Sequence, residues 1–253
     1  MERKIRLDKI LLQKELAPSR ERAQAYIMAG KVFVNNQKLE KPGTLVAVGA
    51  DIHVKNDDHP YVSRGGLKLE KALSVFDIDV SNRIAMDVGA STGGFTDCLL
   101  QHGSSFIFSI DVGYGQLDWK LATHAKVMNL EKRNFRYLEF SEIGTFVDVI
   151  VVDVSFISLT KILKNCFSFL TEGGQLIALI KPQFEAGRDR VGKKGIVKEL
   201  DVHAEIIDSI SLFAGELGFR LIKTEPSPIT GKKSGNIEYL AHMEKPIIRG
   251  ESA

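Results

Sequence analysis

The 253-residue sequence has only two cysteines and no apolar run as long as a membrane-spanning helix. Crossing a bilayer takes roughly 20 apolar residues, so we expect no membrane segment. The first nine residues are charged and no apolar stretch follows them, so we predict no secretory signal. Cys98 and Cys166 have neither metal-site nor disulfide-framework spacing and lie in helix-like apolar surroundings. We therefore expect buried thiols, no bound metal and a cytoplasmic protein.

The glycine-rich stretch Asp87–Thr96 also lacks the marks of two common nucleotide-binding loops. No Gly-Lys-Ser/Thr closes it, as in a phosphate-binding P-loop, and its glycines do not follow G-x-G-x-x-G. It consists of an apolar run ending in Asp87, glycines at positions 89, 93 and 94, and an apolar-periodic segment from Phe95. A strand, a glycine loop and a helix in this order present backbone N–H groups to a cofactor, although an ordinary βα turn has the same pattern.

A second acid, Asp111, ends the next apolar run, 24 residues after Asp87. An acid at this position holds the ribose hydroxyls of an adenosine-type cofactor. We predict a cofactor site here, with Asn134 beside an adenine. The residues assigned to it are Asp87, Gly89, Ala90, Ser91, Thr92, Gly93, Gly94, Phe95, Asp111, Val112, Asn134 and Asp153.

The net charge of +2 is unevenly distributed along the chain. Residues 1–55 carry eleven basic and six acidic side chains, a net +5, while the remainder carries 23 and 26, a net −3. We predict two short helices in this basic segment, the second capped by Ser19, followed by strands at 31–34 and 51–54. Cations on one rim of such a unit suit an RNA backbone, although a protein-binding domain fits the charge as well. The candidate basic residues are Arg6, Arg20, Arg22, Lys31 and, later in the chain, Arg64.

From residue 84 onward, predicted strands and helices alternate, which favours an α/β fold with a doubly wound sheet. We predict strands at 84–88, 106–110, 147–152, 176–180, 220–224 and 237–243, helices at 67–76 and 202–217, and a turn at Gly65–Gly66. We divide the chain into a small α+β domain at 1–55, a polar linker at 56–60 and the α/β domain at 61–253.

Two lysines and two carboxylates stand where they can meet. Asp153 and Lys181 each follow a predicted strand at the carboxyl edge of the sheet, where ligands of open α/β folds bind. Lys68 lies in the first turn of a predicted helix, where a cation opposes the helix dipole, and Glu238 lies in a late strand. A buried lysine is costly unless it is paired. We expect the four to converge as a catalytic group, or to form structural ion pairs.

These motifs resemble two known families. Residues 6–55 resemble the small RNA-binding domain of ribosomal small-subunit protein four, the S-four domain. This resemblance implies RNA contacts at Arg20, Arg22 and Lys31. The remainder resembles the TlyA family, often called hemolysin A and similar to FtsJ-type rRNA ribose methyltransferases. The motifs that carry the second resemblance are Ser-Arg-Gly-Gly-x-Lys-Leu, Asp-Val-Gly-Ala-Ser-Thr-Gly-Gly-Phe-Thr, Asp-Val-Gly-Tyr-Gly-Gln-Leu, Asp-Val-Ser-Phe-Ile-Ser-Leu, Lys-Pro-Gln-Phe-Glu and Gly-Asn-Ile-Glu-Tyr.

The resemblance implies a class I, Rossmann-like methyltransferase that uses S-adenosylmethionine (SAM). The implied reaction is 2′-O-methylation of a cytidine ribose in ribosomal RNA, met as free rRNA or as a ribosomal subunit. It also implies a Lys-Asp-Lys-Glu catalytic tetrad at Lys68, Asp153, Lys181 and Glu238. The chemistry fits, because a ribose hydroxyl is a poor nucleophile that needs in-line placement and loss of a proton.

Other functions fit the sequence less well. An exocyclic amino methyltransferase usually carries two prolines where this chain reads Asp153-Val154-Ser155-Phe156, and a cytosine-carbon methyltransferase needs a loop cysteine. An NAD oxidoreductase leaves the basic segment unexplained. Two alternatives stay open: a membrane-active hemolysin, and a non-catalytic RNA-binding factor in ribosome assembly that retains a SAM pocket.

Overall fold

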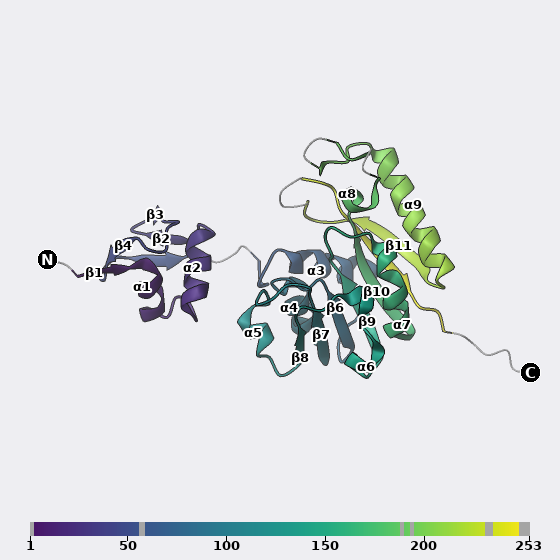
Figure 1. Ribbon diagram of the computed structural model, residues 1–253, viewed down its shortest axis with the longest axis horizontal. Coiled ribbons are helices and arrows are strands. Elements are labelled where there is room, and N and C mark those ends of the chain that lie inside the picture. The colour runs from purple at the N-terminus through teal and green to yellow at the C-terminus, as the bar shows by residue number, and fades with distance from the viewer. Residues whose placement is uncertain (1–2, 56–58, 188–189, 193–194, 231–234, 248–253) are drawn as a thin grey trace, which may run out of the picture. The chain divides into compact units, whose positions relative to one another are not determined.

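The chain divides into two units, Met1–Pro60 and Tyr61–Ala253. The computed structural model describes residues 3–55, 59–187, 190–192, 195–230 and 235–247 (Figure 1). The described residues of the first unit form two helices and five short strands. Its elements are β1 (Lys4–Arg6), α1 (Leu7–Gln13), α2 (Arg20–Met28), β2 (Val32–Val34), β3 (Gln37–Lys38), β4 (Leu45–Ala47) and β5 (Ile52–Val54).

Local signals explain much of the first unit. The Ser19 hydroxyl accepts a hydrogen bond from the Arg22 backbone N–H at 3.2 Å, which confirms the predicted cap of α2. Asn35 and Asn36 both adopt left-handed backbone in the turn between β2 and β3. The helices pack on the sheets through buried side chains such as Leu7 and Ile27. Strands β1, β3 and β4 are absent from the predicted set, since each has only two or three residues and none forms a run of apolar β-branched residues like that of β2.

The second unit is built on a seven-stranded sheet with the order β11-β12-β10-β9-β6-β7-β8. Neighbouring strands from β10 to β8 run parallel, and β12 is antiparallel to both β10 and β11. The strands are β6 (Ile84–Val88), β7 (Phe106–Ile110), β8 (Val127–Leu130), β9 (Val147–Val152), β10 (Leu170–Ile180), β11 (Arg220–Pro226) and β12 (Tyr239–Glu244). The helices are α3 (Gly65–Phe76), α4 (Gly94–Gln101), α5 (Trp119–Ala122), α6 (Phe140–Ile143), α7 (Leu163–Phe169), α8 (Pro182–Glu185) and α9 (Leu200–Glu216), with 3-10 turns η1 (Phe135–Tyr137) and η2 (Leu159–Lys161).

Helices cover both faces of this sheet (Figure 1). Alternate residues of β9 serve the two faces: Val149 and Val151 join a core with α3 and α4, while Ile150 and Val152 join a core with α7 and α9. Strands buried on both faces read as continuous apolar runs, which is why they can be predicted from the sequence. The expected α/β fold is confirmed.

Strand β6 lies between β7 and β9, so the chain leaves β6 in one direction and later returns on its other side. Open α/β sheets bind ligands in the crevice at such a switch point, beyond the carboxyl ends of the strands. The topology therefore places the ends of β6, β7 and β9 around one potential site.

Two predictions about local structure are wrong. Gly65–Gly66 is not a turn but the start of α3. A Cβ on Gly66 would lie 2.2 Å from Cγ of Tyr61, so the helix can begin here only without a side chain. Strand β10 begins at Leu170 rather than at residue 176. The glycine pair Gly173–Gly174 looks like a turn in sequence, but it forms an irregularity within the strand.

Candidate active site

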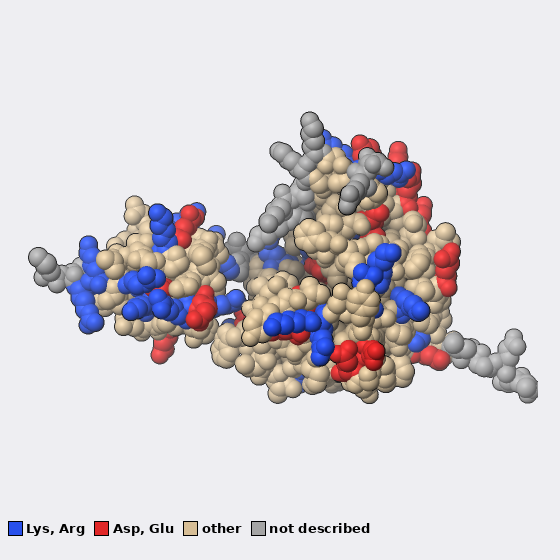
Figure 2. All heavy atoms as spheres, in the orientation of Figure 1, with Lys and Arg blue, Asp and Glu red and all other residues tan. Residues whose placement is uncertain are grey.

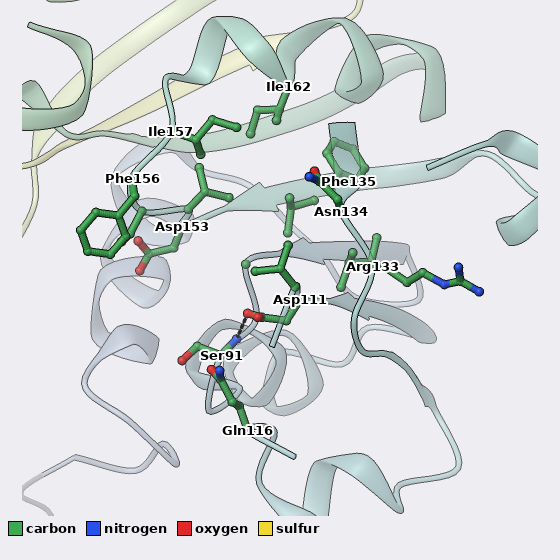
Figure 3. A pocket seen from close by; sticks show the side chains of 16 residues that line it. Ser91, Asp111, Gln116, Arg133, Asn134, Phe135, Asp153, Phe156, Ile157 and Ile162 are labelled. Atoms are coloured by element: carbon green, nitrogen blue, oxygen red, sulfur yellow. Dashed lines mark hydrogen bonds between the residues drawn. The ribbon is translucent and has the colours of Figure 1, made fainter. Parts of the chain in front are cut away.

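A cavity of about 470 Å³ opens at the carboxyl ends of β6, β7 and β9, within the range of small-molecule sites. Six of the predicted cofactor residues line it, from the glycine loop and from the ends of three strands. They are Gly89, Ser91, Asp111, Val112, Asn134 and Asp153. Figure 3 shows the cavity walls and the position of Asp111 and Asp153 on different strands.

Two glycines of the loop, Gly89 and Gly93, stand where the structure leaves no room for a side chain. Gly89 has φ +85°, and a Cβ there would lie 2.9 Å from the backbone oxygen of Asp153. Gly93 has φ +94°, and its Cβ would lie 2.3 Å from Cδ1 of Leu121. The backbone that follows β6 therefore approaches the backbone that follows β9 closely. Because glycine has no side chain, the loop backbone stays accessible to a ligand in the cavity.

Asp111 braces this loop from β7. Its Oδ2 accepts a hydrogen bond from the Ser91 N–H at 2.8 Å (Figure 3), and its Oδ1 accepts one from the Gly113 N–H at 2.7 Å. A carboxylate oxygen can accept more than one hydrogen bond, so both oxygens keep capacity for hydroxyl donors from the cavity.

Asp87 does not line the cavity, contrary to its assignment as a cofactor residue. It is fully buried, and its Oδ2 accepts hydrogen bonds from the Thr96 N–H at 2.9 Å and from the Thr96 hydroxyl at 2.7 Å. Burial raises the pKa of Asp87 to about 7, although the bonds from Thr96 oppose this shift. The carboxyl group therefore links β6 to the first turn of α4 through its hydrogen bonds with Thr96.

Five other predicted residues also lie outside the lining: Ala90, Thr92, Gly93, Gly94 and Phe95. The last three are buried because α4 starts there and packs into the core. Sequence reasoning missed a further set of lining residues after β7, β8 and β9. These are Gln116, Arg133, Phe135, Val154, Ser155, Phe156, Ile157 and Ile162, beside the ends of β6 and β7 at Val88 and Ile110. Their only sequence signal is proximity to Asp111, Asn134 and Asp153.

The structure brings Lys68, Asp153, Lys181 and Glu238 together. Lys68 Nζ lies 2.6 Å from Glu238 Oε2 and 3.4 Å from Asp153 Oδ2. Lys181 forms an ion pair with Asp153 Oδ1 and donates a hydrogen bond to the Ser155 hydroxyl at 3.1 Å. Asp153 is thus shared between the two ammonium groups.

Neighbouring strands explain this convergence. Asp153 follows β9, Lys181 follows the adjacent β10, and Glu238 directly precedes β12, the next strand. Lys68 reaches the same edge from α3, which packs on the sheet through Leu69. We name these four residues the tetrad.

The tetrad is nearly dry, and its charges balance. The side chains of both lysines and of Glu238 are at most 10% exposed, whereas that of Asp153 is 20% exposed and lines the cavity. Burial alone would raise the pKa of Asp153, but Lys181 and, less strongly, Lys68 outweigh it and hold that pKa below its ordinary value. Asp153 therefore stays ionised and fixes both amines at the cavity edge.

The basic residues of the first unit have mixed roles. The buried carboxylate of Asp8 accepts hydrogen bonds from Arg6 Nη2 at 2.9 Å, Arg20 Nε at 3.1 Å and Gln24 Nε2 at 3.0 Å. The bond from Arg6 lowers the pKa of Asp8, with help from Gln24 and Arg20, and burial opposes it. Arg6 and Arg20 are 41% and 48% exposed, so each combines a structural bond with a half-exposed cation.

Two other predicted cations flank an aromatic ring. Arg22 and Lys31 lie 5.5 and 5.9 Å from the ring centre of Tyr26. Basic side chains gather on the visible face of this unit (Figure 2). Arg64, in the second unit, is exposed at the start of α3.

Comparisons with known proteins match both units. The family model of FtsJ-like methyltransferases matches residues 61–245, and that of the S4 domain matches residues 5–52. The 16S/23S rRNA (cytidine-2'-O)-methyltransferase TlyA of Mycobacterium tuberculosis is 39% identical over 100% of this chain and 94% of its own length. The protein named Hemolysin A from Brachyspira hyodysenteriae is 42% identical over 94% of this chain and 99% of its own.

Solved structures share the fold. A structure from Streptococcus thermophilus, also named as a hemolysin, is 43% identical with a TM-score of 0.74, covering 97% of this chain and 90% of its own. The N-methyltransferase NodS from Bradyrhizobium japonicum, solved with S-adenosyl-l-homocysteine, has a TM-score of 0.51 at 16% identity, covering 76% of this chain and 90% of its own. At that identity only the fold is shared.

Proposed function

The chain belongs to the FtsJ-like methyltransferase family and carries an S4 domain, and from this premise we propose that it methylates the 2′-hydroxyl of a cytidine ribose in ribosomal RNA. The names of its TlyA relatives supply the substrate. The observation that carries the proposal is the tetrad at the edge of a cofactor-sized cavity. We also propose a cytoplasmic location, because ribosomes are there.

The cavity fits SAM. Gly89 and Ser91 offer a bare loop, Asp111 has acceptor capacity for ribose hydroxyls, and Asn134 and Phe135 lie beyond the neighbouring strand, where they can flank an adenine. When bound, SAM supplies an electrophilic methyl group on a sulfonium. The residues of this chain must then orient the ribose hydroxyl and take its proton.

Lys181 is the residue best placed for that task. Its amine is held by Asp153 and Ser155, two residues that line the cavity, and its strand is fixed in the sheet. An amine accepts a proton only in its neutral form, so the charges of Lys68, Asp153 and Glu238 govern the step as one coupled set. We infer that Lys181 accepts the hydroxyl proton or positions the hydroxyl for attack.

The test is single-turnover transfer of labelled methyl to ribosomes from an unmodified strain. Lys181→Arg keeps the cation but cannot deprotonate. We expect it to keep the fold and SAM affinity and to lose transfer by a factor on the order of 10² or more, the scale of a general base. Near wild-type transfer by this variant would leave Lys181 an electrostatic role at most. No transfer by the wild type would instead favour the non-catalytic assembly factor.

The name of the Brachyspira relative keeps a membrane-active hemolysin as the second candidate. In the part of the chain that the structure describes, no helix is long and apolar enough to cross a membrane. Leakage of liposomes on addition of purified protein tests lytic activity directly. Leakage that persists in Lys181→Arg would establish a separate activity.

A further inference from the structure

The loop between β9 and η2, residues 153–158, forms one wall of the cavity. We name residues 153–158 the wall loop. Its first five residues, Asp153 to Ile157, line the cavity. Phe156 stands at its apex with φ +66° and a side chain that is 91% exposed (Figure 3). A left-handed backbone is unfavourable for a bulky residue, and it persists only where its surroundings impose it.

The imposing contacts come from the segment that follows β10. Lys181 holds the first half of the wall loop through Asp153 and through the Ser155 hydroxyl at 3.1 Å. The ring of Phe184 lies 5.1 Å from that of Phe156. Both segments follow neighbouring parallel strands, so the wall loop and α8 run side by side.

Glu185 fastens the far end of the wall loop. Its Oε1 accepts a hydrogen bond from the Leu159 backbone N–H at 2.9 Å. Burial raises the pKa of Glu185, and its interactions with Ser158 and with the Leu159 N–H oppose the shift. Glu185 does not itself line the cavity. Its carboxyl group is therefore engaged with the loop and not with the space where ligands bind.

The two fastenings are rigidly joined. Lys181 directly precedes α8 and Glu185 is its last residue, and the Phe184 N–H donates a hydrogen bond to the Lys181 carbonyl at 2.9 Å. The wall loop is thus held at both ends by one short segment. Ser155 lies between this far end and Asp153, and both Ser155 and Asp153 hold the Lys181 amine.

We propose that Glu185 is a positioning residue, which keeps the wall loop closed against α8 and, through Ser155, keeps Lys181 aligned for methyl transfer. This rests on the proposed function. The contribution is geometric, because small displacements of reacting groups cost rate more than affinity.

The experiment compares Glu185→Ala, Glu185→Gln and Ser155→Ala in single-turnover methyl transfer at saturating SAM and ribosomes, with separate measurement of RNA affinity. We expect Glu185→Ala to lower the rate constant by about 10- to 100-fold and Ser155→Ala by about tenfold, with RNA affinity unchanged. Glu185→Gln keeps a carbonyl acceptor for the Leu159 N–H and should stay within about threefold of the wild type.

Lys245→Ala is the matched control for lost stability. Lys245 donates to the carbonyls of Phe167 and Leu170 at 3.0 and 2.8 Å, and it lies at the opposite edge of the sheet. This variant should unfold at a lower temperature yet transfer methyl at the wild-type rate when folded.

Three results would overturn the proposal while the wild type is active: a wild-type rate in either Glu185→Ala or Ser155→Ala, a glutamine variant as slow as the alanine variant, or an equal rate loss in Lys245→Ala. If Glu185→Ala does not fold, the glutamine and Ser155→Ala rates decide by the same criteria. An inactive wild type would contradict the proposed function instead.

Discussion

At the scale of single residues, the two acids of the glycine-loop motif have different tasks. Asp111 faces the cavity and holds the loop through Ser91 and Gly113, whereas Asp87 is buried beneath it. The same residue type therefore lines the cavity in one place and supports internal structure in the other. Each assignment has its own test.

Asp111→Ala should weaken SAM binding by at least tenfold. The variant removes the ribose acceptor and frees the Ser91 N–H, and hydrogen bonds to a charged group are worth about 1.5–3 kcal/mol each. Titration calorimetry gives the affinity. Asp79→Ala is the control, because Asp79 also accepts bonds from a backbone N–H and a hydroxyl, those of Ser81, outside the cavity. Equal affinities for the wild type and Asp111→Ala would remove Asp111 from the site.

Asp87→Asn should change how stability depends on pH. With a pKa of about 7, folded Asp87 keeps its proton up to neutral pH, whereas the unfolded carboxyl loses it near pH 4. Between these values the folded state binds more protons, so raising the pH destabilises the wild type by up to about 1 kcal/mol per unit. Asparagine keeps the acceptor for Thr96 and removes this slope.

Urea unfolding at pH 5, 6 and 7 measures the difference, followed by the fluorescence of Trp119, the only tryptophan. The stability of Asp87→Asn relative to wild type should rise with pH across this window. The ion pairs of Asp153 affect stability in a different pH range, because the stability from its lowered pKa is lost only as the pH falls below about 4. Parallel curves for the two proteins would show that Asp87 ionises normally.

At the scale of secondary-structure elements, the close approach of α3 and α4 joins the proposed catalytic and cofactor-binding parts of the site. A Cβ on Gly94 would lie 2.8 Å from the Gly66 backbone nitrogen and 2.3 Å from the Ser63 hydroxyl. Helix α3 carries Lys68, and α4 begins at the end of the glycine loop. The spacing of α3 and α4 therefore sets the distance between Lys68 and the glycine loop.

Gly94→Ala should push these helices apart, cost about 1–3 kcal/mol of stability and lower methyl transfer. Gly215→Ala in α9 is the counterpart, because its Cβ would meet nothing within 4 Å. It should leave transfer unchanged and gain up to about 1 kcal/mol from helix propensity. Thermal unfolding and the transfer assay measure both. A stable and active Gly94→Ala variant would show that α3 and α4 can accommodate a side chain between them without loss of function.

At the scale of the whole molecule, charge separates the two units. The first carries the excess of basic residues, but the structure reassigns part of it, since Arg20 holds the buried Asp8. Substituting Arg20 therefore confuses RNA affinity with folding. Arg22 and Lys31, which lie beside Tyr26, probe RNA binding apart from the Asp8 cluster.

The double variant Arg22→Ala/Lys31→Ala should reduce the slope of log affinity for rRNA against log salt by about 1 to 2, at roughly 0.7–0.9 per lost phosphate contact. SAM affinity should not change. Lys38→Ala is the control in the same unit, because Lys38 lies outside the predicted RNA contacts and should alter the slope less. An unchanged slope in the double variant would mean that RNA binds elsewhere.

The sequence by itself determined the α/β architecture, the glycine loop and the candidate members of the tetrad. These follow from local patterns: apolar strands, helical periodicity, and polar residues where apolar runs end. Asp153 and Lys181 could be placed at one sheet edge because parallel strands present their carboxyl ends together. Their catalytic roles stay predictions until the variants are measured.

Only the tertiary structure decided which of these residues meet. Periodicity shows that Asp87 and Asp111 lie at strand ends. It does not show that Asp87 is hydrogen-bonded to Thr96 in the interior, or that Asp111 lines the cavity. It gives no sign that Arg20 is bound to Asp8, or that Glu185 holds Leu159. Such pairs are 12 and 26 residues apart in sequence. Packing brings them together, and a pattern read within one element carries no information about its partner in another.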